Sequence, residues 1–228
     1  MSAMFDGLFI QDAVSNPRYY VMVVFTVVVS IVLHELAHGW MAIRRGDHTP
    51  IHMGRMTGNP LVHMGPFSIL VMLFFGIAWG QMPVDPTRLR GRYAEAMVAA
   101  AGPATNFLLG AAALTGLGLW YRFGQVGDTV QWQKNLVFFL YVFGSTNLML
   151  LVFNLFPVPP LDGAHILANF HRGYANFIFD PHNQQYVIFG FIFVFVTAGM
   201  LFDKVIEAAL RYVVFVSGDA TILNTIFR

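Results

Sequence analysis

"VVVSIVLHELAHGWMAIRR", residues 27–45, places two histidines and a glutamate at the end of a strongly apolar run. The run reaches back to Tyr19, and a helix over residues 19–43 would be about 37 Å long at about 1.5 Å per residue. About 20 apolar residues are enough to cross the hydrocarbon of a bilayer. The stretch therefore predicts a membrane-spanning helix that carries ionisable side chains near one end.

The composition of the whole chain agrees with a membrane protein. Hydrophobic residues make up 57% of its 228 residues and charged residues 11%, whereas soluble domains carry about 25% charged residues. The net charge of +1 creates no basic field for nucleic acid. With no cysteine, the chain has neither disulfides nor thiolate ligands, so any metal must bind to His, Asp or Glu. The first apolar run lacks a small-residue cleavage site and is expected to stay in the mature protein.

The pattern of apolar runs predicts an all-α polytopic membrane protein with about five to six membrane helices. We interpret residues 1–228 as a single membrane-embedded domain, because no composition shift marks an appended soluble one. Residues 203–228 either span the membrane or lie at its interface. The predicted helices are three core helices at about 19–43, 93–119 and 136–156, and C-terminal helices at about 186–217.

The apolar stretch 61–80 differs from the core helices because Gly65-Pro66 and Gly76 interrupt it. Arg44 and Arg45 place the end of the first helix on the cytoplasmic side by the positive-inside bias. If 61–80 crossed the membrane, the third core helix would end on the opposite side. We therefore predict a re-entrant, β-hairpin-like segment between the first two core helices, with an edge available to an extended substrate.

The HELAH sequence has the spacing of a metal site. His34 and His38 lie one helical turn apart on one face, so both imidazoles can reach a single metal ion. Glu35 lies about 100° round the helix, beside the metal. A zinc hydrolase needs this arrangement, because a carboxylate next to the metal accepts the proton of the attacking water. The alternative is a set of polar side chains that pack helices together, but an ionisable group at this depth is costly without a function or partner.

Two imidazoles leave a zinc site short of a third protein ligand. The candidate is Asp162 in "NLFPVPPLDGAHIL", residues 154–167, where three prolines end the third core helix. The alternative is that Asp162 caps a short helix over 164–170. Irregular backbone at membrane depth is tolerated where it is buried in protein or lines a watery cavity, which is the setting of a ligand.

The combination of HELAH with the pattern N-x-x-P-x-x-P-L-D-G resembles the site-2 protease family of intramembrane zinc metalloproteases. "GRMTGNPLVHMGP" (54–66) and "AGPATN" (101–106) resemble further segments of that family, so the likeness covers nearly the whole chain. It is similar to the minimal-core branch, without PDZ or CBS domains. One departure follows the Asp-Gly pair, where many relatives have Gly-Arg and this chain has Ala164-His165.

The resemblance implies a set of site residues and one Zn²⁺ per chain. It assigns His34, His38 and Asp162 as ligands and Glu35 as the catalytic base. It places Asn154 near the active site, holding substrate backbone or the developing oxyanion; the alternative is a hydrogen bond between helices. Further candidates for substrate contact are His63, Asn106 and His165.

These features predict an intramembrane zinc endopeptidase that cuts a peptide bond within or near a transmembrane segment of a membrane-anchored protein. The expected setting is a lipid bilayer, namely a prokaryotic plasma membrane with the active site toward the cytoplasm. No nucleic acid partner is expected, and a regulatory membrane partner is left open. The alternative is a noncatalytic protein, either a metal-binding transporter or a pseudoprotease scaffold that binds transmembrane helices. Glu35 favours catalysis, since a binding scaffold needs no base there.

Overall fold

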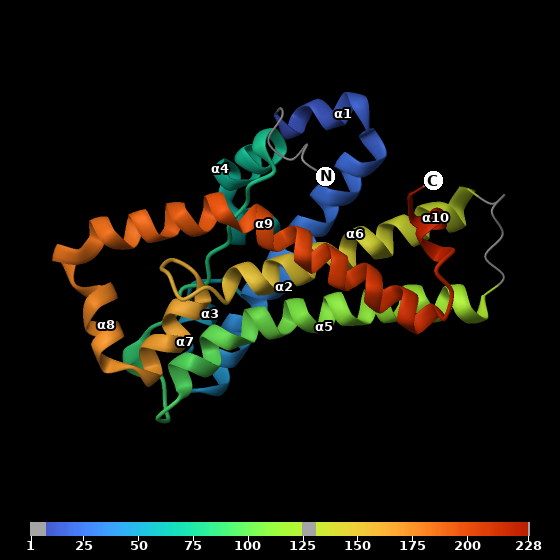
Figure 1. Ribbon diagram of the computed structural model, residues 1–228. Coiled ribbons are helices and arrows are strands. Elements are labelled where there is room, and N and C mark those ends of the chain that lie inside the picture. Colours follow the sequence, from blue (N-terminus) through green and yellow to red (C-terminus); the bar gives the residue numbers. More distant parts are fainter. Residues whose placement is uncertain (1–7, 125–130, 228) are drawn as a thin grey trace.

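The computed structural model describes residues 8–124 and 131–227, and within these ranges the chain is helical and contains no β-strand (Figure 1). The α-helices are α1 (Asp12–Ser15), α2 (Pro17–Arg44), α3 (Thr49–His52), α4 (Pro60–Phe75), α5 (Ala94–Phe123), α6 (Gln131–Asn154), α7 (Asp162–Phe170), α8 (Arg172–Phe179), α9 (Gln184–Ser217) and α10 (Ile222–Phe227). Short 3-10 turns are η2 (Phe9–Gln11), η3 (Pro86–Arg88) and η4 (Pro181–Asn183).

Four helical segments of the described chain are long and apolar enough to cross a membrane, namely α2, α5, α6 and the Pro181–Ser217 segment that contains α9. This is fewer than the predicted five to six. One reason is that α9 runs on without a break through the charged residues near 203–211, so the predicted C-terminal helices are one helix. The helix at Pro60–Phe75 is too short to span, which agrees with the prediction that residues 61–80 do not cross the membrane.

The predicted β-hairpin at 61–80 is wrong, because α4 occupies most of that stretch. Asn59 accepts a hydrogen bond from the backbone of Leu61 at the start of the helix. Gly65 interrupts it with φ of 70° and ψ of 164°, and Gly76 ends it in the left-handed region with φ of 72°. The two glycines that indicated hairpin turns are thus a helix break and a helix end. Sixteen residues reach only about 24 Å.

After Gly76 the chain folds back along α4 as irregular backbone rather than as a strand. The Ser68 hydroxyl donates to the carbonyl of Trp79 over 2.8 Å and accepts from the N–H of Trp79 over 3.0 Å. The N–H of Gln81 donates to the carbonyl of His63 over 3.0 Å. These bonds hold residues 77–84 against α4 and beside α2.

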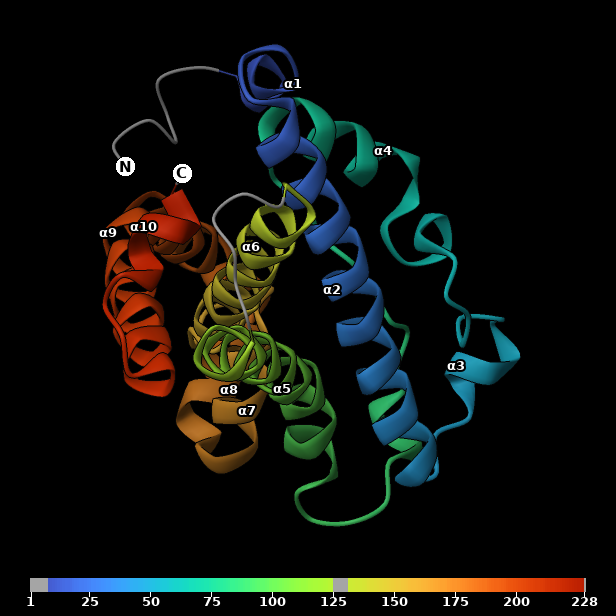
Figure 2. The ribbon, with the colours of Figure 1, turned by 90° about the vertical axis from the view of Figure 1, so that its right-hand side faces the viewer.

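Helix α5 is the central element of the bundle. It contacts α2, α6, α7 and α9, and the view of Figure 2 shows α5 and α6 between α2 on one side and α9 on the other. Gly110 of α5 and Gly144 of α6 lie at their crossing, where a Cβ on Gly110 would be 3.1 Å from the Gly144 carbonyl oxygen. Small residues at a crossing allow helix backbones to approach closely in a membrane.

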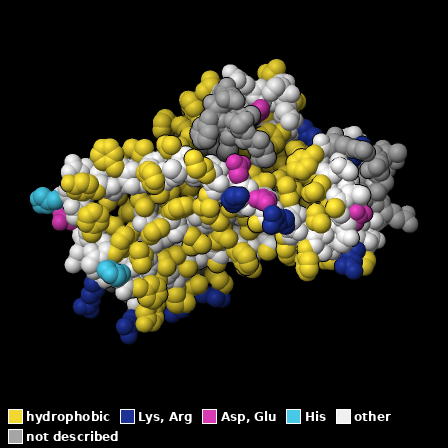
Figure 3. Space-filling view, in the orientation of Figure 1, with side chains coloured by type: hydrophobic (Ala, Val, Ile, Leu, Met, Phe, Trp, Pro, Cys, Tyr) yellow, Lys and Arg dark blue, Asp and Glu magenta, His cyan; other side chains and the backbone are white. Residues whose placement is uncertain are grey.

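The surface is that of a protein solvated by lipid. Hydrophobic side chains cover much of the face in Figure 3. Along α9, Phe189, Phe193 and Met200 are 70%, 69% and 78% exposed. Large aromatic and aliphatic side chains are stable in such positions when hydrocarbon rather than water surrounds them. The surface and the four apolar helices identify an integral membrane protein.

The arginine-bearing segments on either side of α4 lie at one end of the bundle. The N–H of Arg90 donates to the carbonyl of Arg45 over 2.7 Å, which joins the end of α2 to the segment before α5. The chain between them therefore leaves and returns to the same end of the molecule.

Asp47 fastens the same two segments from inside. Its fully buried carboxylate accepts hydrogen bonds from the N–H and hydroxyl of Thr49, over 2.9 and 2.5 Å, and from the N–H of Asp85 over 2.8 Å. Burial alone raises the pKa of Asp47, but the hydrogen bonds from Thr49 and Asp85 outweigh burial and hold its pKa below the ordinary value. The carboxylate thus ties the end of α2 to the chain that follows residues 77–84.

We expect Asp47→Asn to lower the free energy of unfolding by about 1–3 kcal/mol, because an amide would turn one N–H donor toward another buried donor. The folded pKa of Asp47 is depressed, so its contribution is complete above the unfolded carboxyl pKa of about 3.9 and is lost as the pH falls through the lower folded value. Thermal unfolding in detergent across a pH series measures this. The difference in melting temperature between wild type and Asp47→Asn should become smaller in acid. The exposed Asp203→Asn should melt like wild type at every pH. A difference in melting temperature between wild type and Asp47→Asn that does not change with pH would contradict the role of the carboxylate.

Candidate metal centre

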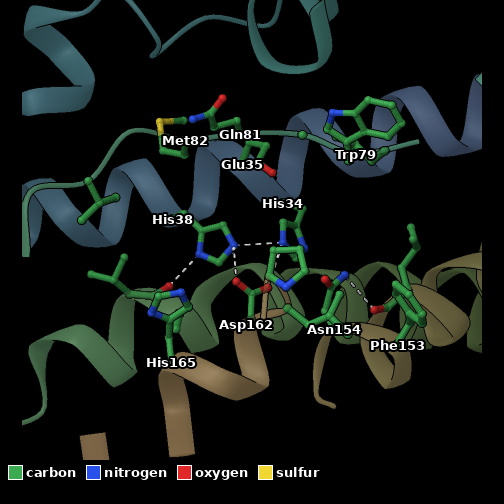
Figure 4. Close-up of a pocket in the computed structure, with 18 of the residues that line it drawn as sticks. His34, Glu35, His38, Trp79, Gln81, Met82, Phe153, Asn154, Asp162 and His165 are labelled. Atoms are coloured by element: carbon green, nitrogen blue, oxygen red, sulfur yellow. Dashed lines mark hydrogen bonds and ion pairs between the residues drawn. The ribbon is translucent and has the colours of Figure 1, made fainter. Parts of the chain in front are cut away.

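A cavity of about 790 Å³ lies where α2, α5, α6, α7 and α9 meet residues 77–84. Helix α2 contributes His34, Glu35 and His38 to its wall, and α7 contributes Asp162. Figure 4 shows both imidazoles pointing from α2 toward Asp162. The three side chains of α2 are each no more than 8% exposed, so the polar wall of the cavity is enclosed by the bundle.

Three ligand atoms converge in this cavity. The Nε2 atom of His34 is 3.1 Å from one carboxylate oxygen of Asp162, and Nε2 of His38 is 3.3 Å from the other. The two Nε2 atoms are 2.9 Å apart, and one ligand atom from each residue lies within 4.8 Å of the others. Two nitrogen lone pairs and a carboxylate that face one another form a site for a cation.

Asp162 reaches the histidines because of how α6 ends and α7 begins. Asn154 is the last residue of α6, and the prolines that follow prevent the helix from continuing. Leu161 is the N-cap of α7 and Asp162 its first residue, with no side-chain cap at this end. The carboxylate therefore faces the histidines. At Gly163 a Cβ would collide with the backbone of Leu155, so only glycine allows the chain to pass this closely.

The hydrogen bond of His38 leaves its Nε2 atom free to bind a metal. Its Nδ1 atom is 2.7 Å from the carbonyl oxygen of Val98 on α5. A backbone carbonyl only accepts, so Nδ1 must carry the proton and Nε2 presents its lone pair to the cavity. An acceptor behind a ligating histidine is the usual device that sets ring orientation and tautomer.

His34 is held in the same way by a side chain. Its Nδ1 atom is 2.6 Å from the amide oxygen of Asn106. Asn106 is fully buried and lies behind the imidazole, where it orients His34. Asn106 also lines the cavity, so the predicted contact with substrate stays a prediction beside its observed contact with His34.

Glu35 lies on the side of α2 that faces the returning chain. A Cβ on Gly80 would be 2.5 Å from a carboxylate oxygen of Glu35 and 2.7 Å from the methyl group of Ile31. Glycine at position 80 therefore leaves room for the carboxyl group. Glu35 lines the same cavity as the two histidines without belonging to the converging trio, which suits a proton acceptor more than a ligand.

Asn154 and His165 also line the cavity. The amide nitrogen of Asn154 donates to the carbonyl of Leu150 over 3.0 Å, and this bond uses one of its two protons. His165 is paired with Glu95 of α5, with Nδ1 3.6 Å from the carboxylate oxygen, and both side chains are partly exposed. Both residues can therefore contact a molecule that enters.

The structure places His63 outside the group of residues that line the cavity. Its buried side chain has Nε2 2.7 Å from the carbonyl of Thr57, and its own carbonyl binds the N–H of Gln81. His63 therefore supports the returning chain, through its backbone carbonyl, at Gln81.

Gly102 is a residue of the site that sequence reasoning did not identify. A Cβ there would be 2.5 Å from Cε1 and Nε2 of His34, and closer still to Nε2 of His38. Only hydrogen fits against the point where the ligand nitrogens meet. The sequence places this glycine in "AGPATN" but gives no sign that its neighbours in space are His34 and His38.

The donor set fits zinc. Two imidazole nitrogens and one carboxylate supply three ligands, which leaves a fourth tetrahedral position for water or substrate. The space beside Gly102 that a Cβ would fill keeps the ligand nitrogens accessible. A bundle of apolar helices around such a trio defines a membrane-embedded metalloprotein with the ligand set of a catalytic zinc site.

Comparison with known proteins gives the family. The model of peptidase family M50, the site-2 proteases, matches residues 22–198. This match covers well over half of the chain, so the chain belongs to that family. The resemblance found in its motifs is confirmed, and zinc is the metal that the family and the donor set indicate.

Curated relatives carry names of the same kind. The chain is 35% identical over 149 residues to "Putative zinc metalloprotease YwhC" of Bacillus subtilis (strain 168), covering 64% of this chain and 67% of the relative. It is 32% identical over 151 residues to "Putative zinc metalloprotease Rip2" of Mycolicibacterium smegmatis, covering 63% of this chain and 55% of the relative. No solved structure matches the chain.

We expect Gly102→Ala to weaken zinc binding by about 10- to 100-fold, the range found when the support of metal ligands is disturbed. The added methyl group would occupy the space in which the ligand nitrogens meet. Gly116→Ala is the matched control on α5, because a Cβ there meets nothing within 4 Å. Competition with a chromophoric chelator, on detergent-purified protein, measures the zinc dissociation constant of each variant. Equal affinities for Gly102→Ala and wild type would contradict the geometry.

Proposed function

We propose that the chain is an intramembrane zinc endopeptidase that hydrolyses a peptide bond within or near a transmembrane segment of a membrane-anchored protein. The observation that carries this proposal is the meeting of His34, His38 and Asp162, beside Glu35, in a cavity enclosed by apolar helices. Membership of the site-2 protease family and the zinc metalloprotease names of the relatives support it.

In the proposed mechanism His34, His38 and Asp162 would hold zinc, and the bound ion would supply Lewis-acid activation of a water and of the scissile carbonyl. Glu35 accepts the proton of the attacking water and passes it to the leaving amine. Its position beside Gly80, outside the ligand trio, leaves the carboxylate free for this transfer. The enclosing helices limit bulk water, which strengthens electrostatic interactions in the cavity.

The substrate is proposed to enter as an unwound peptide. Carbonyls within a helix are engaged in hydrogen bonds, so the scissile one must be released before it can be polarised. A cavity of about 790 Å³ lies within the range of sites that enclose small ligands, and it suits a few extended residues. Asn154 has an N–H left for a substrate carbonyl or oxyanion, and His165 lies where it can contact flanking residues.

We further propose that this cavity opens toward the cytoplasm of a prokaryotic cell. Arg44 and Arg45 end α2, and the bond from Arg90 to Arg45 brings the segment with Arg88 and Arg92 to the same end. Clustered arginines favour the cytoplasmic face, and the HELAH turn is within three turns of that end of α2. The described helices form one domain in this proposal, since α5 contacts α2, α6, α7 and α9.

Glu35→Gln should reduce cleavage by at least about 100-fold, because it removes the general base, while zinc stays near one per chain. Asp162→Ala should lose both zinc and cleavage, because two imidazoles alone hold zinc weakly. The measurement combines zinc content with cleavage of a panel of single-span substrates by detergent-purified protein. Glu207→Gln, an exposed glutamate of α9, is the matched control and should cleave like wild type.

Substantial cleavage by Glu35→Gln would remove Glu35 from the role of base. Zinc bound by wild type and by Asp162→Ala alike would remove Asp162 from the ligand set. The absence of zinc from wild type would overturn the proposal and leave a helix-binding scaffold as the better account.

A further inference from the structure

A chain of buried hydrogen bonds runs from the ligand His34 through α5 to α6. The Nδ1 atom of His34 meets the amide oxygen of Asn106 at 2.6 Å. The amide nitrogen of Asn106 donates to the amide oxygen of Asn147 over 2.9 Å. The amide nitrogen of Asn147 then donates to the carbonyl of Phe143, one turn back on its own helix, over 2.9 Å. Asn106 and Asn147 are both fully buried.

The final acceptor fixes the direction of every bond in this chain. The Phe143 carbonyl only accepts, so Asn147 must turn its NH₂ group toward it and its oxygen toward Asn106. Asn106 must then turn its NH₂ group toward Asn147 and its oxygen toward His34. An oxygen only accepts, so Nδ1 of His34 must carry the proton and Nε2 must be bare. The orientation of two amides thus follows from one backbone carbonyl rather than from an arbitrary choice of flip.

We propose that Asn147 is a positioning residue of the metal centre, which acts through Asn106 to hold His34 in the tautomer and orientation that present Nε2 to zinc. The tautomer and orientation of His38 are set directly by its hydrogen bond to the Val98 carbonyl. For His34, two buried amides stand between the ring and the backbone carbonyl of Phe143 that ends the chain. This proposal rests on zinc binding by His34 and is independent of peptide hydrolysis.

Burial makes this chain effective. Neither asparagine exposes surface to water, and a buried amide that loses its partner costs about 1–3 kcal/mol. If Asn106 turned its NH₂ group toward His34, its oxygen would face the amide oxygen of Asn147, and two buried acceptors would meet without a proton between them. The correct orientation is therefore strongly preferred before any metal arrives, which is the condition for a preorganised ligand.

The test uses Asn147→Val, which removes both hydrogen-bonding groups and leaves little room for a water. Asn147→Ala is the second variant, for use if the valine side chain prevents folding. Ser145→Ala is the matched control, since Ser145 is buried on the same helix but bonds to the Tyr141 carbonyl of α6. Each detergent-purified protein is checked by thermal unfolding, and its zinc dissociation constant is measured by competition with a chelator. The visible spectrum of the cobalt form reports the ligand geometry.

We expect Asn147→Val to weaken zinc binding by about 10-fold and to alter the cobalt spectrum, while Ser145→Ala binds zinc like wild type. In the background of Asn106→Ala, the further change Asn147→Val should have almost no effect on zinc affinity, because residues that act through one another are not additive. Folded Asn147→Val with wild-type zinc affinity would overturn the proposal. So would an undiminished effect of Asn147→Val in the Asn106→Ala background, since Asn147 would then act by another route.

Discussion

The structure depends on the convergence of two imidazole nitrogens and a carboxylate inside an apolar bundle. Polar and ionisable groups at membrane depth are costly unless they are paired or bind an ion. Here Asp162 lies within 3.3 Å of both histidines, and the trio can be shared by one zinc ion. The prolines after α6, the glycines at 102 and 163, and the return of residues 77–84 along α2 can all be understood as ways of bringing backbone close to this point.

Backbone carbonyls, which accept hydrogen bonds but cannot donate them, set the orientation of both histidines. The Val98 carbonyl orients His38, and the Phe143 carbonyl is the fixed end of the chain that reaches His34 through two asparagines. In a membrane there is little water to compensate an amide that points the wrong way. The direction of these hydrogen bonds therefore links the orientation of His34 on α2, across α5, to a carbonyl of α6. Packing alone would not set which ring nitrogen carries the proton.

Sequence reasoning predicted the features of this site that depend on residues close together in the chain. The four-residue spacing of His34 and His38 is a property of one helix, and α2 has it. Asp162 could be proposed because prolines mark an irregular segment and because the motif resembles a family, while its closeness to the histidines depends on the packing of α7. The same local reasoning failed at Gly65 and Gly76, since a glycine with positive φ serves a hairpin turn, a helix break or a helix end equally well.

Contacts between segments that are distant in the chain could not be predicted from the sequence. Asn106 was a candidate for substrate contact, and the sequence could not show that its amide oxygen meets Nδ1 of His34. Asn147 gave no signal, since a single asparagine in a membrane helix is as easily explained by helix packing. Gly102 lies four residues before Asn106 on α5, and only the position of α2 shows that both of them touch His34.

X-ray absorption at the zinc K-edge of the purified wild-type protein tests the metal centre most directly. We expect about one zinc per chain with nitrogen and oxygen ligands at about 2.0–2.2 Å, and outer scattering from two imidazoles. Zinc coordinated by fewer than two imidazoles, or a protein that retains no zinc, would contradict the assignment of His34, His38 and Asp162 as its ligands.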